Sequence, residues 1–480
     1  MVFKHIYDED LAQGSYFIGC QQTGEAVVVD PRRDIQVYLD EAATNNMTIV
    51  AVTETHIHAD FLSGSRELAR ATGATLYLSD EGDENWKYSF GDEKLYDGDT
   101  ITIGNTKLGA VHTPGHTPEH LSFLVTDGAQ ADEPGFYLTG DFVFVGDVGR
   151  PDLLDEAALS TGSRFGDAKR LFGSLKTSFI DLPDYVQVWP GHGAGSACGK
   201  SLGAVASTTV GYERTFSWWA YYVQNDDERG FVDALLEGQP DAPKYFSRMK
   251  RQNREGPALL GERSGLEGLE PREIKARIGT DLLLVDTRAA DTFKKDAIRG
   301  ALNVPRGKSF ATYASYVIDP EKDTRDIVFL ATDEAQADRL RNKLSYIGID
   351  NVAGYVTSVE GLEREEVKRV SPDELEGMRN AFVLDVRTAS EYASGHIPGA
   401  RQLHAGRVMW TLDELPRDRP LVTHCQSGAR NAVVASALRE AGFDNVTELE
   451  GSLAAWEAAD KPVSKSSSSV GFPARRFTEV

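Results

Sequence analysis

The stretch ETHIHADFLSGSREL, from Glu54 to Leu68, directly follows the run TIVAVT, which is rich in β-branched residues. It places His56, His58 and Asp60 at alternate positions where a predicted strand ends, and loops at strand ends commonly carry chemistry. Imidazoles and carboxylates are ordinary metal ligands. The next residue, Phe61, cannot bind a metal. The stretch therefore predicts a metal centre at the end of a strand.

The length and composition indicate a multidomain globular protein. The 480 residues suggest about three domains, with 41% hydrophobic and 26% charged residues. The net charge of −23 disfavours nucleic acid as a partner. No apolar run of about 18 residues is present, so we expect no membrane partner.

The N-terminal stretch and the cysteines indicate the compartment. The first residues lack a basic stretch leading into an apolar one, so a secretory signal is not expected and we place the chain in the cytoplasm. Cys20, Cys198 and Cys425 are far apart and odd in number, which argues against a disulfide framework. Each thiol is expected to have its own role, and Cys20 is expected in the core.

The first 256 residues alternate short strand-like runs with turns. The runs are EAVVVD, TIVAVTET, ATLYLS, KLGAVHT, GFYLTGD and VQVWPG. The aromatic run TFSWWAYYV (215–223) and the segment GFVDALLEG (230–238) are predicted as helices. The polar stretch KRQNREGP (250–257) is predicted as a boundary, so that the first domain covers residues 1–256.

The remaining chain contains an internal repeat. LLLVDTR (282–288) corresponds to FVLDVR (382–387), with Asp286 and Asp385 offset by 99 positions. Each copy has the strand and helix pattern of a parallel α/β domain. We expect copies at 257–367 and 368–464, followed by a serine-rich tail at 465–480 that is too polar to form a core.

Three further motifs follow predicted strands: HTPGHTPEH (112–120), LTGD ending at Asp141, and WPGH ending at His192. With the first motif, they resemble the metallo-β-lactamase superfamily over about 250 residues. The resemblance implies an αββα sandwich with a metal site. His56, His116 and Asp141 stand at ligand positions of the motifs, whereas His112 and His120 do not and are expected to be structural.

Phe61 stands where dinuclear members carry a second-metal histidine, so a single metal is the better interpretation. Two imidazoles and one carboxylate form the facial triad that suits non-haem Fe(II). The pattern is similar to the persulfide dioxygenase branch, which implies one Fe(II) per chain held by His56, His116 and Asp141. By this resemblance His58, Asp60 and His192 orient ligands and waters without binding iron. Phe61 departs from members that keep a histidine there.

Three residues near the centre have two interpretations each. Arg150 and Asp152, in the run Gly149–Asp152, form either a bracing ion pair or, through Arg150, a substrate contact. Cys198 lies six residues beyond His192, on a loop expected to stay near the metal. It is either buried and inert, or an exposed thiol that transfers sulfane sulfur.

The loop CQSGAR, from Cys425 to Arg430, lies between a predicted strand and a predicted helix. Such a loop turns its amide groups toward the cysteine sulfur and favours an anion there. Arg430 adds positive charge. Gln426, Ser427, Gly428 and Ala429 complete the loop as expected substrate contacts. A phosphatase could carry a cysteine loop too, but DVR at 385–387 and HIPGA at 396–400 resemble the rhodanese family of sulfurtransferases.

The middle copy has Asp333 in place of Cys425, and a carboxylate cannot accept sulfane sulfur. We expect an inactive rhodanese-like domain that acts as a scaffold, with an anion-sensing pocket as the alternative. The expected fold class is thus α/β: a metallo-β-lactamase sandwich followed by two rhodanese-like, doubly wound parallel-sheet domains.

This order of domains looks like the fusion proteins of bacterial sulfide detoxification. The resemblance implies that low-molecular-weight thiol persulfides and O₂ give sulfite, which attacks a persulfide on Cys425 and yields thiosulfate. Coenzyme A, cysteine, glutathione and bacillithiol persulfides are all open as substrates. We also expect a homo-oligomer. Two alternatives are a zinc-dependent thioester hydrolase with an accessory sulfurtransferase, and a noncatalytic sulfane-sulfur carrier.

Overall fold

The computed structural model describes residues 1–153, 163–200, 202–239 and 241–465. The chain divides into two compact units. The first comprises Met1–Ala242, Phe246–Arg263 and Tyr346–Gly348, and the second Pro243–Tyr245, Ser264–Ser345 and Ile349–Val480. The predicted serine-rich tail lies outside the described residues from position 466 onward.

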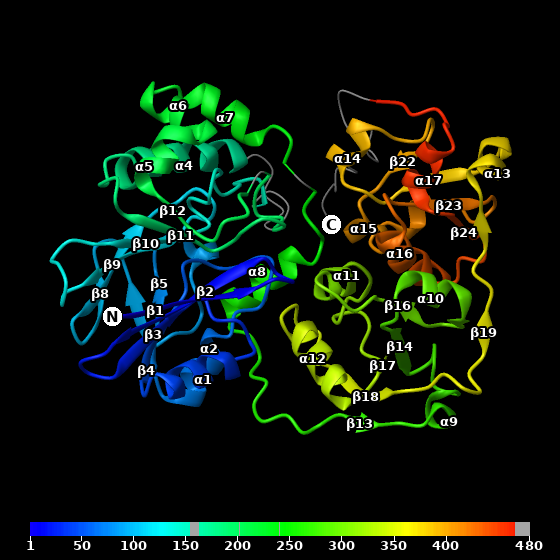
Figure 1. The fold of residues 1–480 in the computed structure, drawn as a ribbon, viewed down its shortest axis with the longest axis horizontal. Helices are drawn as coiled ribbons and strands as arrows, with labels where there is room; N and C mark the ends of the chain where they lie inside the picture. Colours follow the sequence, from blue (N-terminus) through cyan, green and yellow to red (C-terminus); the bar gives the residue numbers. More distant parts are fainter. Residues whose placement is uncertain (154–162, 201, 240, 466–480) are drawn as a thin grey trace. The chain divides into compact units, whose positions relative to one another are not determined.

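The first unit is built on two six-stranded sheets (Figure 1). One has the order β1-β2-β3-β4-β5-β6: β1 Val2–Asp8, β2 Gln13–Cys20, β3 Glu25–Val29, β4 Thr48–Thr53, β5 Thr75–Ser79 and β6 Glu93–Leu95. The other has the order β12-β11-β10-β9-β8-β7: β7 Thr100–Ile103, β8 Thr106–His112, β9 Leu121–Asp127, β10 Phe136–Gly140, β11 Gln187–Pro190 and β12 Thr208–Thr209. The six strand-like runs of the sequence are confirmed as β3, β4, β5, β8, β10 and β11.

Strand β3 shows how the layers form. Val27 and Val29 face a core that also contains Phe123 and Leu138 of the opposite sheet. Val28, between them, faces a second core, because successive side chains on a strand point to opposite faces. The second core is covered by helices α1 (Gln36–Thr44) and α2 (Ser65–Thr72).

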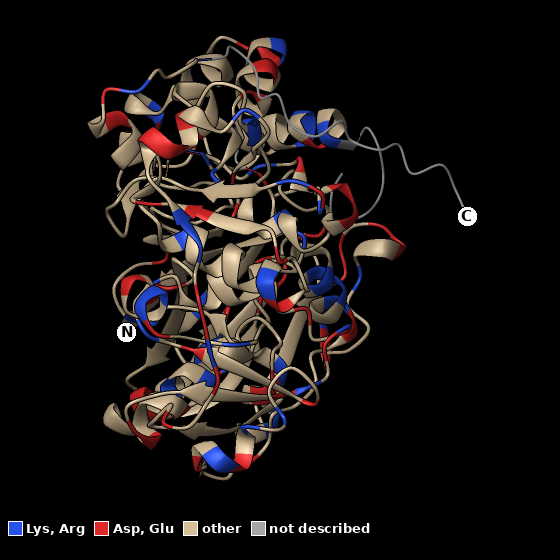
Figure 2. Ribbon diagram, turned by 90° about the vertical axis from the view of Figure 1, so that its right-hand side faces the viewer, with Lys and Arg blue, Asp and Glu red and all other residues tan. Residues whose placement is uncertain are grey.

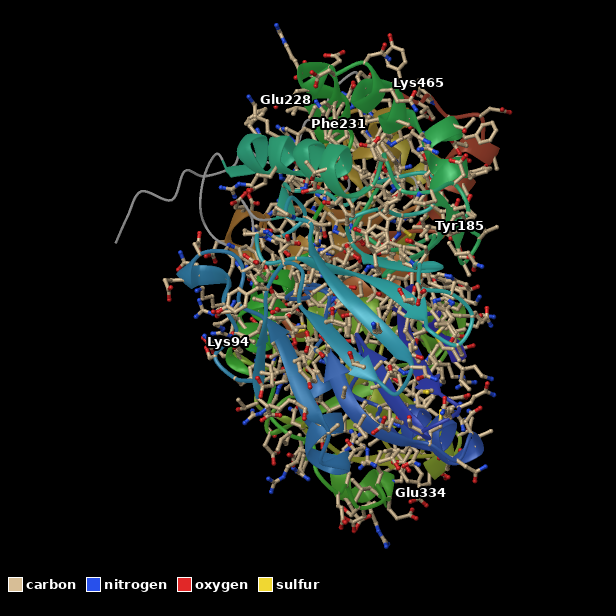
Figure 3. All side chains as sticks on the ribbon, turned by 90° about the vertical axis from the view of Figure 1, so that its left-hand side faces the viewer. Lys94, Tyr185, Glu228, Phe231, Glu334 and Lys465 are labelled. Atoms are coloured by element: carbon tan, nitrogen blue, oxygen red, sulfur yellow. The ribbon has the colours of Figure 1, made fainter. Side chains whose placement is uncertain are left out.

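Helices α4 (Ser163–Ser178), α6 (Trp218–Gln224) and α7 (Glu228–Leu236) cover the outer face of the other sheet. Within α7, Glu228 pairs with Lys169 of α4 at 3.0 Å, while Phe231 is buried one turn later (Figure 3). The unit is therefore helix, sheet, sheet, helix, as the αββα prediction requires.

In this unit one local prediction is wrong, and one stretch predicted as a boundary is helical. The aromatic run 215–223 is not one helix, because Ser217 is extended (φ −75°, ψ 143°) and separates α5 (Val210–Phe216) from α6. The predicted boundary KRQNREGP lies mostly inside helix α8, Phe246–Glu255. The polar residues Arg248, Lys250 and Asn253 of this helix are buried along with its apolar residues. Its polar sequence therefore resembles a linker although the segment is a packed helix.

The second unit contains two five-stranded parallel sheets. One has the order β13-β18-β17-β14-β16: β13 Glu267–Gly268, β14 Leu282–Asp286, β16 Leu302–Asn303, β17 Asp326–Leu330 and β18 Val352–Val356. The other has the order β20-β24-β23-β21-β22: β20 Arg369–Val370, β21 Phe382–Asp385, β22 Arg401–Gln402, β23 Leu421–His424 and β24 Val446–Leu449. When the five strands of each sheet are numbered in chain order, both sheets have the strand order 1-5-4-2-3.

The helices of the two copies also alternate with these strands. The middle copy has α9 Pro271–Ile274, α10 Ala290–Lys295, α11 Phe310–Val317 and α12 Glu334–Ser345, and the small strands β15 Ala297–Ile298 and β19 Arg364–Glu365 pair with each other. The C-terminal copy has α13 Pro372–Gly377, α14 Ala389–Ser394, α15 Ala405–Val408, α16 Ala429–Glu440 and α17 Ser452–Ala458. The internal repeat is therefore present in the chain path as well as in the sequence.

The repeated Asp-x-Arg motif forms the same clasp in both copies. Arg288 binds Asp286 (2.5 Å) and the carbonyl of Asp296 (2.9 Å). Arg387 binds Asp385 (2.6 Å) and the carbonyl of Gly395 (2.7 Å). In each case the carbonyl lies eight residues beyond the arginine, so the motif fixes the turn that follows the second strand of each copy.

Charged residues of both signs are interspersed along the helices and loops (Figure 2). Within the described residues, no helix has the length and apolar character needed to cross a membrane.

Candidate metal centre and sulfur-transfer loop

The ligand candidates of the first unit stand just beyond the ends of strands. His56 follows β4, His116 follows β8, Asp141 follows β10 and His192 follows β11. Gly140 precedes Asp141 with φ +49°, and a methyl group there would lie 2.6 Å from Thr55 Oγ1. The glycine of the TGD motif therefore lets the carboxylate of Asp141 approach the histidine loop closely.

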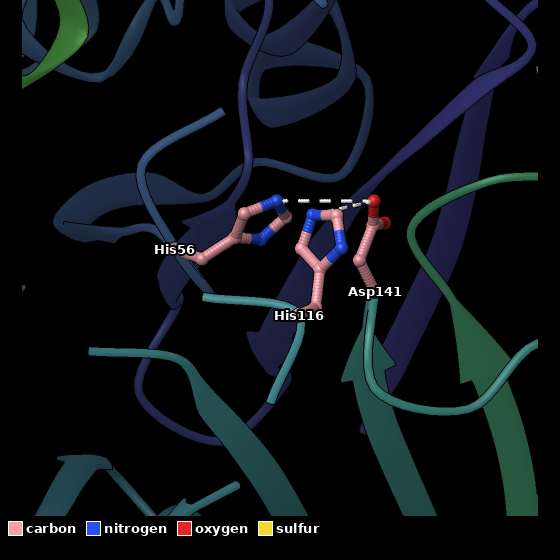
Figure 4. Close-up of side chains that lie close together, drawn as sticks. All are labelled: His56, His116 and Asp141. Carbon is pink, nitrogen blue, oxygen red and sulfur yellow. Dashed lines mark ion pairs between the residues drawn. The ribbon is translucent and has the colours of Figure 1, made fainter. Parts of the chain in front are cut away.

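His56, His116 and Asp141 meet in one buried group (Figure 4). Asp141 Oδ2 lies 3.3 Å from His116 Nε2 and 3.9 Å from His56 Nε2. The two imidazole rings are 5.0 Å apart and nearly perpendicular, at 88°. One ligand atom from each residue therefore converges on a single point.

The hydrogen bonds of Thr55 determine which nitrogen of His56 carries the proton. Thr55 Oγ1 donates to Asp30 Oδ2 at 2.9 Å, so its hydrogen is already used. It must then accept from His56 Nδ1, which lies 2.9 Å away. The lone pair of His56 Nε2 is left facing Asp141, as a metal ligand requires.

His116 is oriented in the same way by a backbone carbonyl. Its Nδ1 donates to the oxygen of Arg150 at 3.1 Å, because a carbonyl can only accept. Its Nε2 lone pair therefore also faces Asp141 Oδ2, a buried atom without a hydrogen-bond partner among the described residues. Three electron-rich atoms thus face one another without a donor between them. This donor set fits a bound cation.

Burial keeps both histidines of this group neutral. It lowers the pKa of His56 well below its usual value and also lowers the pKa of His116. Burial alone would raise the pKa of Asp141, but the neighbouring His192 and His116 hold it well below its usual range. The three groups are therefore in the protonation states of metal ligands.

His58 turns away from this group toward Asp30, with its Nε2 3.1 Å from Asp30 Oδ1. Burial opposes a charge on this imidazole, but Asp30 outweighs it and raises the pKa of His58 to about 9. Asp30 also accepts from the amide of Thr55 at 2.7 Å. His58 is therefore an ion-pair partner that anchors the histidine loop.

His192 bridges two carboxylates. Its Nδ1 lies 2.7 Å from Asp141 Oδ1 and its Nε2 lies 2.8 Å from Asp60 Oδ2. Burial would lower its pKa, but the two carboxylates raise it well above the usual value. His192 donates in both directions and holds the two aspartates in fixed positions.

Cys198 lies beside Asp60 and His192, with the candidate ligand atoms of all three within 4.8 Å of one another. The sequence placed it near the metal and left its exposure open, and the structure finds it buried, with 2% of its surface exposed. Burial, followed by the charges of Asp141 and Asp60, raises the pKa of Cys198 well above its usual value. The interpretation as an exposed, readily ionised thiol is wrong.

Arg150 and Asp152 form the bracing pair. The guanidinium donates to both carboxylate oxygens (2.9 and 2.5 Å) and to the carbonyl of Ala197 (3.0 Å). This last contact joins the loop after Asp141 to the segment before Cys198. With its side chain held in this way and its carbonyl holding His116, Arg150 is suited to organise the site rather than to project into it.

Phe61 is fully buried, 4.5 Å from the ring of His58, in a small apolar cluster with Leu11 and Tyr346 of the same unit. The ring of Phe61 therefore offers no ligand atom and packs against the ring of His58. Asn253 of α8 donates to the carbonyls of His58 and Phe61, at 2.8 and 2.7 Å, and fixes the backbone there.

Several residues of the site were not found from the sequence. His120, expected only to be structural, accepts the amide hydrogen of Asp141 at 3.1 Å. A small cavity borders His116 and is lined by Ile57, Ala59, Trp86, Thr117, Leu153 and Lys250 as well. Lys250 lies 3.4 Å from the centre of the Trp86 ring, and burial lowers its pKa to about 8. No sequence motif identifies Lys250 as a site residue, because it lies on helix α8, far along the chain from the other residues of the cavity.

The C-terminal copy builds the second site on the loop between β23 and α16. Gly428, at φ +110°, donates its amide hydrogen to Cys425 Sγ at 3.1 Å. The amide of Cys425 binds Ser452 Oγ at 3.3 Å. Cys425 is 2% exposed, whereas Ser427 and Ala429 are exposed on the rim. The sulfur therefore lies at the base of a short loop, against the start of α16.

The charged groups of this loop are paired. Arg430 donates to both oxygens of Glu391, at 2.8 and 2.6 Å. Burial would raise the pKa of Glu391, but Arg430 outweighs it and lowers the pKa to about 2. Gln426 accepts from Arg387 at 3.1 Å. Arg430, expected to face a substrate anion, is thus engaged by a carboxylate of its own copy.

Asp333 of the middle copy is exposed at the start of α12. Its carboxylate accepts from the amide of Gln336 at 2.7 Å and from the hydroxyl of Thr332 at 3.0 Å. It caps the helix, as aspartate commonly does. The carboxylate of Asp333 is therefore engaged at the start of α12.

Comparisons with known proteins agree with this division. The metallo-beta-lactamase superfamily matches residues 10–192, and the rhodanese-like domain matches residues 371–459. A crystal structure of a metallo-beta-lactamase from Staphylococcus aureus is 39% identical, with a TM-score of 0.65, and covers 74% of this chain and 99% of that chain.

Three curated relatives each match part of the chain. Hydroxyacylglutathione hydrolase from Nitrosococcus oceani is 27% identical over 46% of this chain and 76% of that protein. The mitochondrial persulfide dioxygenase ETHE1 from Bos taurus is 24% identical over 40% of this chain and 68% of that protein. A sulfurtransferase from Allochromatium vinosum is 34% identical over 18% of this chain and 78% of that protein.

Proposed function

Because the chain belongs to the metallo-beta-lactamase superfamily and carries a rhodanese-like domain toward its C-terminal end, we propose that it couples persulfide oxidation to sulfur transfer. Low-molecular-weight thiol persulfides are oxidised by O₂ to sulfite in the first unit, and Cys425 transfers sulfane sulfur to give thiosulfate. The observation that carries the proposal is the convergence of His56, His116 and Asp141 on one point.

The donor set favours iron over zinc. Two neutral imidazoles and one carboxylate leave positions open for substrate, which is the ligand set of non-haem Fe(II) oxygenases. When bound, one Fe(II) per chain would supply the redox chemistry with O₂. The similarity to a persulfide dioxygenase supports this choice.

The surrounding residues hold the ligands in place. Thr55 and the carbonyl of Arg150 fix the tautomers of the two histidines. His192 binds Asp141 and Asp60 and holds both in position. Lys250, at the cavity that borders His116, supplies positive charge that suits an anionic persulfide. Cys198 shapes the pocket beside Asp60 as a neutral thiol.

The transfer step needs no external oxidant or reductant. Sulfite attacks the outer sulfur of a persulfide on Cys425 with its lone pair, and the new sulfur–sulfur bond gives thiosulfate. The old bond breaks toward Cys425, which leaves as a thiolate. The amide of Gly428 and the start of α16 stabilise that negative charge.

The middle copy is proposed as a rhodanese-like domain without transfer activity. Its strand order and its Asp286–Arg288 clasp match those of the C-terminal copy, but Asp333 caps a helix where Cys425 stands. We keep the domain limits 1–256, 257–367 and 368–464. A homo-oligomer is proposed on the exposed aromatic residues Tyr212, Phe216 and Tyr221 of α5 and α6.

A zinc thioester hydrolase with an accessory sulfurtransferase is the second candidate, supported by the similarity to a hydroxyacylglutathione hydrolase. It would need no O₂. A protein that carries sulfane sulfur without catalysing a reaction is the third candidate.

The test combines metal analysis with an oxygen electrode. Protein purified without air should contain about one iron per chain and consume O₂ with glutathione, coenzyme A or cysteine persulfide. Asp141→Ala should lose iron and O₂ uptake but still transfer sulfur from thiosulfate. Zinc at the centre with thioester hydrolysis and no O₂ uptake would refute the dioxygenase in favour of the hydrolase, and sulfur loading without any turnover would leave only the carrier.

A further inference from the structure

Two arginines that contact or belong to the loop of Cys425 are already paired within the C-terminal copy. Arg430 is held by both oxygens of Glu391, and Arg387 by both oxygens of Asp385. Thiosulfate and sulfite carry two negative charges that need donors at the loop. Positive charge from another source would therefore strengthen their binding.

Lys294, from α10 of the middle copy, lies against this loop. Its ammonium group is 3.0 Å from Glu448 of β24, and a methyl group added at Gly428 would lie 3.4 Å from Lys294 Nζ. Gly428 is the residue whose amide reaches Cys425 Sγ. The side chain of Lys294 is 10% exposed. The ammonium thus reaches the sulfur-transfer loop from a different copy.

The pairing of Lys294 leaves room for a second role. Glu448 also accepts from Asn431 at 3.0 Å and from Arg439 at 3.3 Å, so its carboxylate stays satisfied without the lysine. An ammonium group has three hydrogens to donate, and the ion pair with Glu448 uses one of them. Loss of Lys294 would therefore not leave a buried carboxylate without partners.

Helix α11 of the middle copy brings a second polar group. Tyr316 is buried in the cluster that contains Cys425, and Tyr313 packs against the same cluster. Burial raises the pKa of Tyr313; the charge of Arg430 lowers this pKa and that of Cys425 raises it, so both groups act on the hydroxyl. The hydroxyl remains protonated at neutral pH and can donate to an anion.

We propose that the cysteine-less copy forms part of the sulfur-transfer site, where Lys294 and Tyr313 recognise the oxyanion group of thiosulfate and sulfite. This inference rests on the proposed sulfur transfer at Cys425. It gives the middle copy a role in substrate binding in addition to that of a scaffold.

The test uses the full chain in single-turnover loading of Cys425 by thiosulfate, followed by mass spectrometry. Lys294→Gln should raise the thiosulfate concentration for half-maximal loading about tenfold, because a hydrogen bond between charged groups is lost. Lys295→Gln, the exposed neighbour, should change nothing. Discharge of preloaded Cys425 by cyanide, which carries no oxyanion group, should be equally fast in all variants.

Tyr313→Phe gives an independent measurement, with Tyr355→Phe of β18 as its matched control. It should also weaken loading by several fold without slowing discharge. If wild-type protein and Cys425→Ser both fail to load sulfur, the proposed transfer and this inference fall together. If wild-type protein loads normally and the Lys294 and Tyr313 variants match their controls, only the inference is overturned.

Discussion

His192 donates to Asp141 on one side and to Asp60 on the other, over 2.7 and 2.8 Å, so that one imidazole separates two buried carboxylates. Without it, the two negative charges would repel each other in a buried region. The metal-binding carboxylate is therefore positioned by a cation that does not itself point at the centre.

His116→Ala should remove metal binding, whereas His112→Ala should not. His116 presents a lone pair to Asp141 Oδ2 at 3.3 Å, while His112 Nε2 is bound to the carbonyl of Pro118 at 2.8 Å. We expect His116→Ala to retain less than about a tenth of the wild-type iron, because a ligand is lost. Equal iron contents in the two variants, measured by elemental analysis, would contradict the assignment.

Thr55→Val should weaken metal binding without removing a ligand. The valine cannot accept from His56 Nδ1, so the imidazole is free to carry its proton on the metal-facing nitrogen. Loss of such an orienting partner typically reduces metal affinity about 10- to 100-fold. Competition with a chelator measures the change, and Thr72→Val, whose hydroxyl bonds only within the α2 region, is the control.

Cys198→Ser should slow persulfide oxidation while iron content stays unchanged. The sulfur groups with Asp60 and His192, and the three proposed ligands form a separate group. We expect a change of a few fold, because a smaller and more polar hydroxyl alters a buried pocket. Steady-state O₂ uptake with several persulfides checks it. Unaltered kinetics with every persulfide would remove Cys198 from the site.

Asp333→Ala should lower the melting temperature slightly and leave sulfur transfer intact. The carboxylate caps α12 through the amide of Gln336, and no contact of Asp333 among the described residues reaches the loop of Cys425. Cys425→Ser should instead abolish thiosulfate formation and leave sulfite as the product. A large loss of transfer in folded Asp333→Ala would mean that the middle pocket takes part in the chemistry.

Glu119→Gln should change the pH dependence of stability. Burial raises the pKa of Glu119 to about 7 from a usual value of 4.5, so the folded state holds the proton more tightly than the unfolded state. Stability therefore falls as pH rises from about 4.5 to 7, by about 3 kcal/mol for this group. The glutamine variant should lack this loss and gain stability relative to wild type across that range.

Thermal melts from pH 5 to 7.5 test this, with Glu84→Gln as the control because that carboxylate is 93% exposed. Glutamine at position 119 keeps an oxygen for the amide of Ile57, now 2.7 Å from Glu119 Oε1. Parallel melting curves for wild type and Glu119→Gln would show that Glu119 titrates normally.

The sequence predicted the elements whose signal is local. Strand β3 was found because its valines are β-branched and continuous, and the repeat was found because LLLVDTR and FVLDVR share side chains that form the same clasp. The metal group was predicted from four motifs at strand ends. Each of these signals lies within a few consecutive residues.

Features that depend on tertiary packing were missed. Lys250 reaches the cavity beside His116 from a helix whose sequence is mostly polar. The burial of Cys198 depends on its neighbours in space, and the pairing of Arg430 depends on Glu391, 39 residues away. Neither spacing nor composition encodes such contacts.

The position of Tyr316 has a consequence for how the second unit comes apart. This side chain belongs to the middle copy but is buried among residues of the C-terminal copy, next to His404 at 5.3 Å between ring centres. Unfolding either copy would expose apolar surface of the other, so the two should lose amide protection in hydrogen exchange together. The duplicated halves would then behave as one cooperative folding unit, and a cut between them would not yield two independently stable pieces.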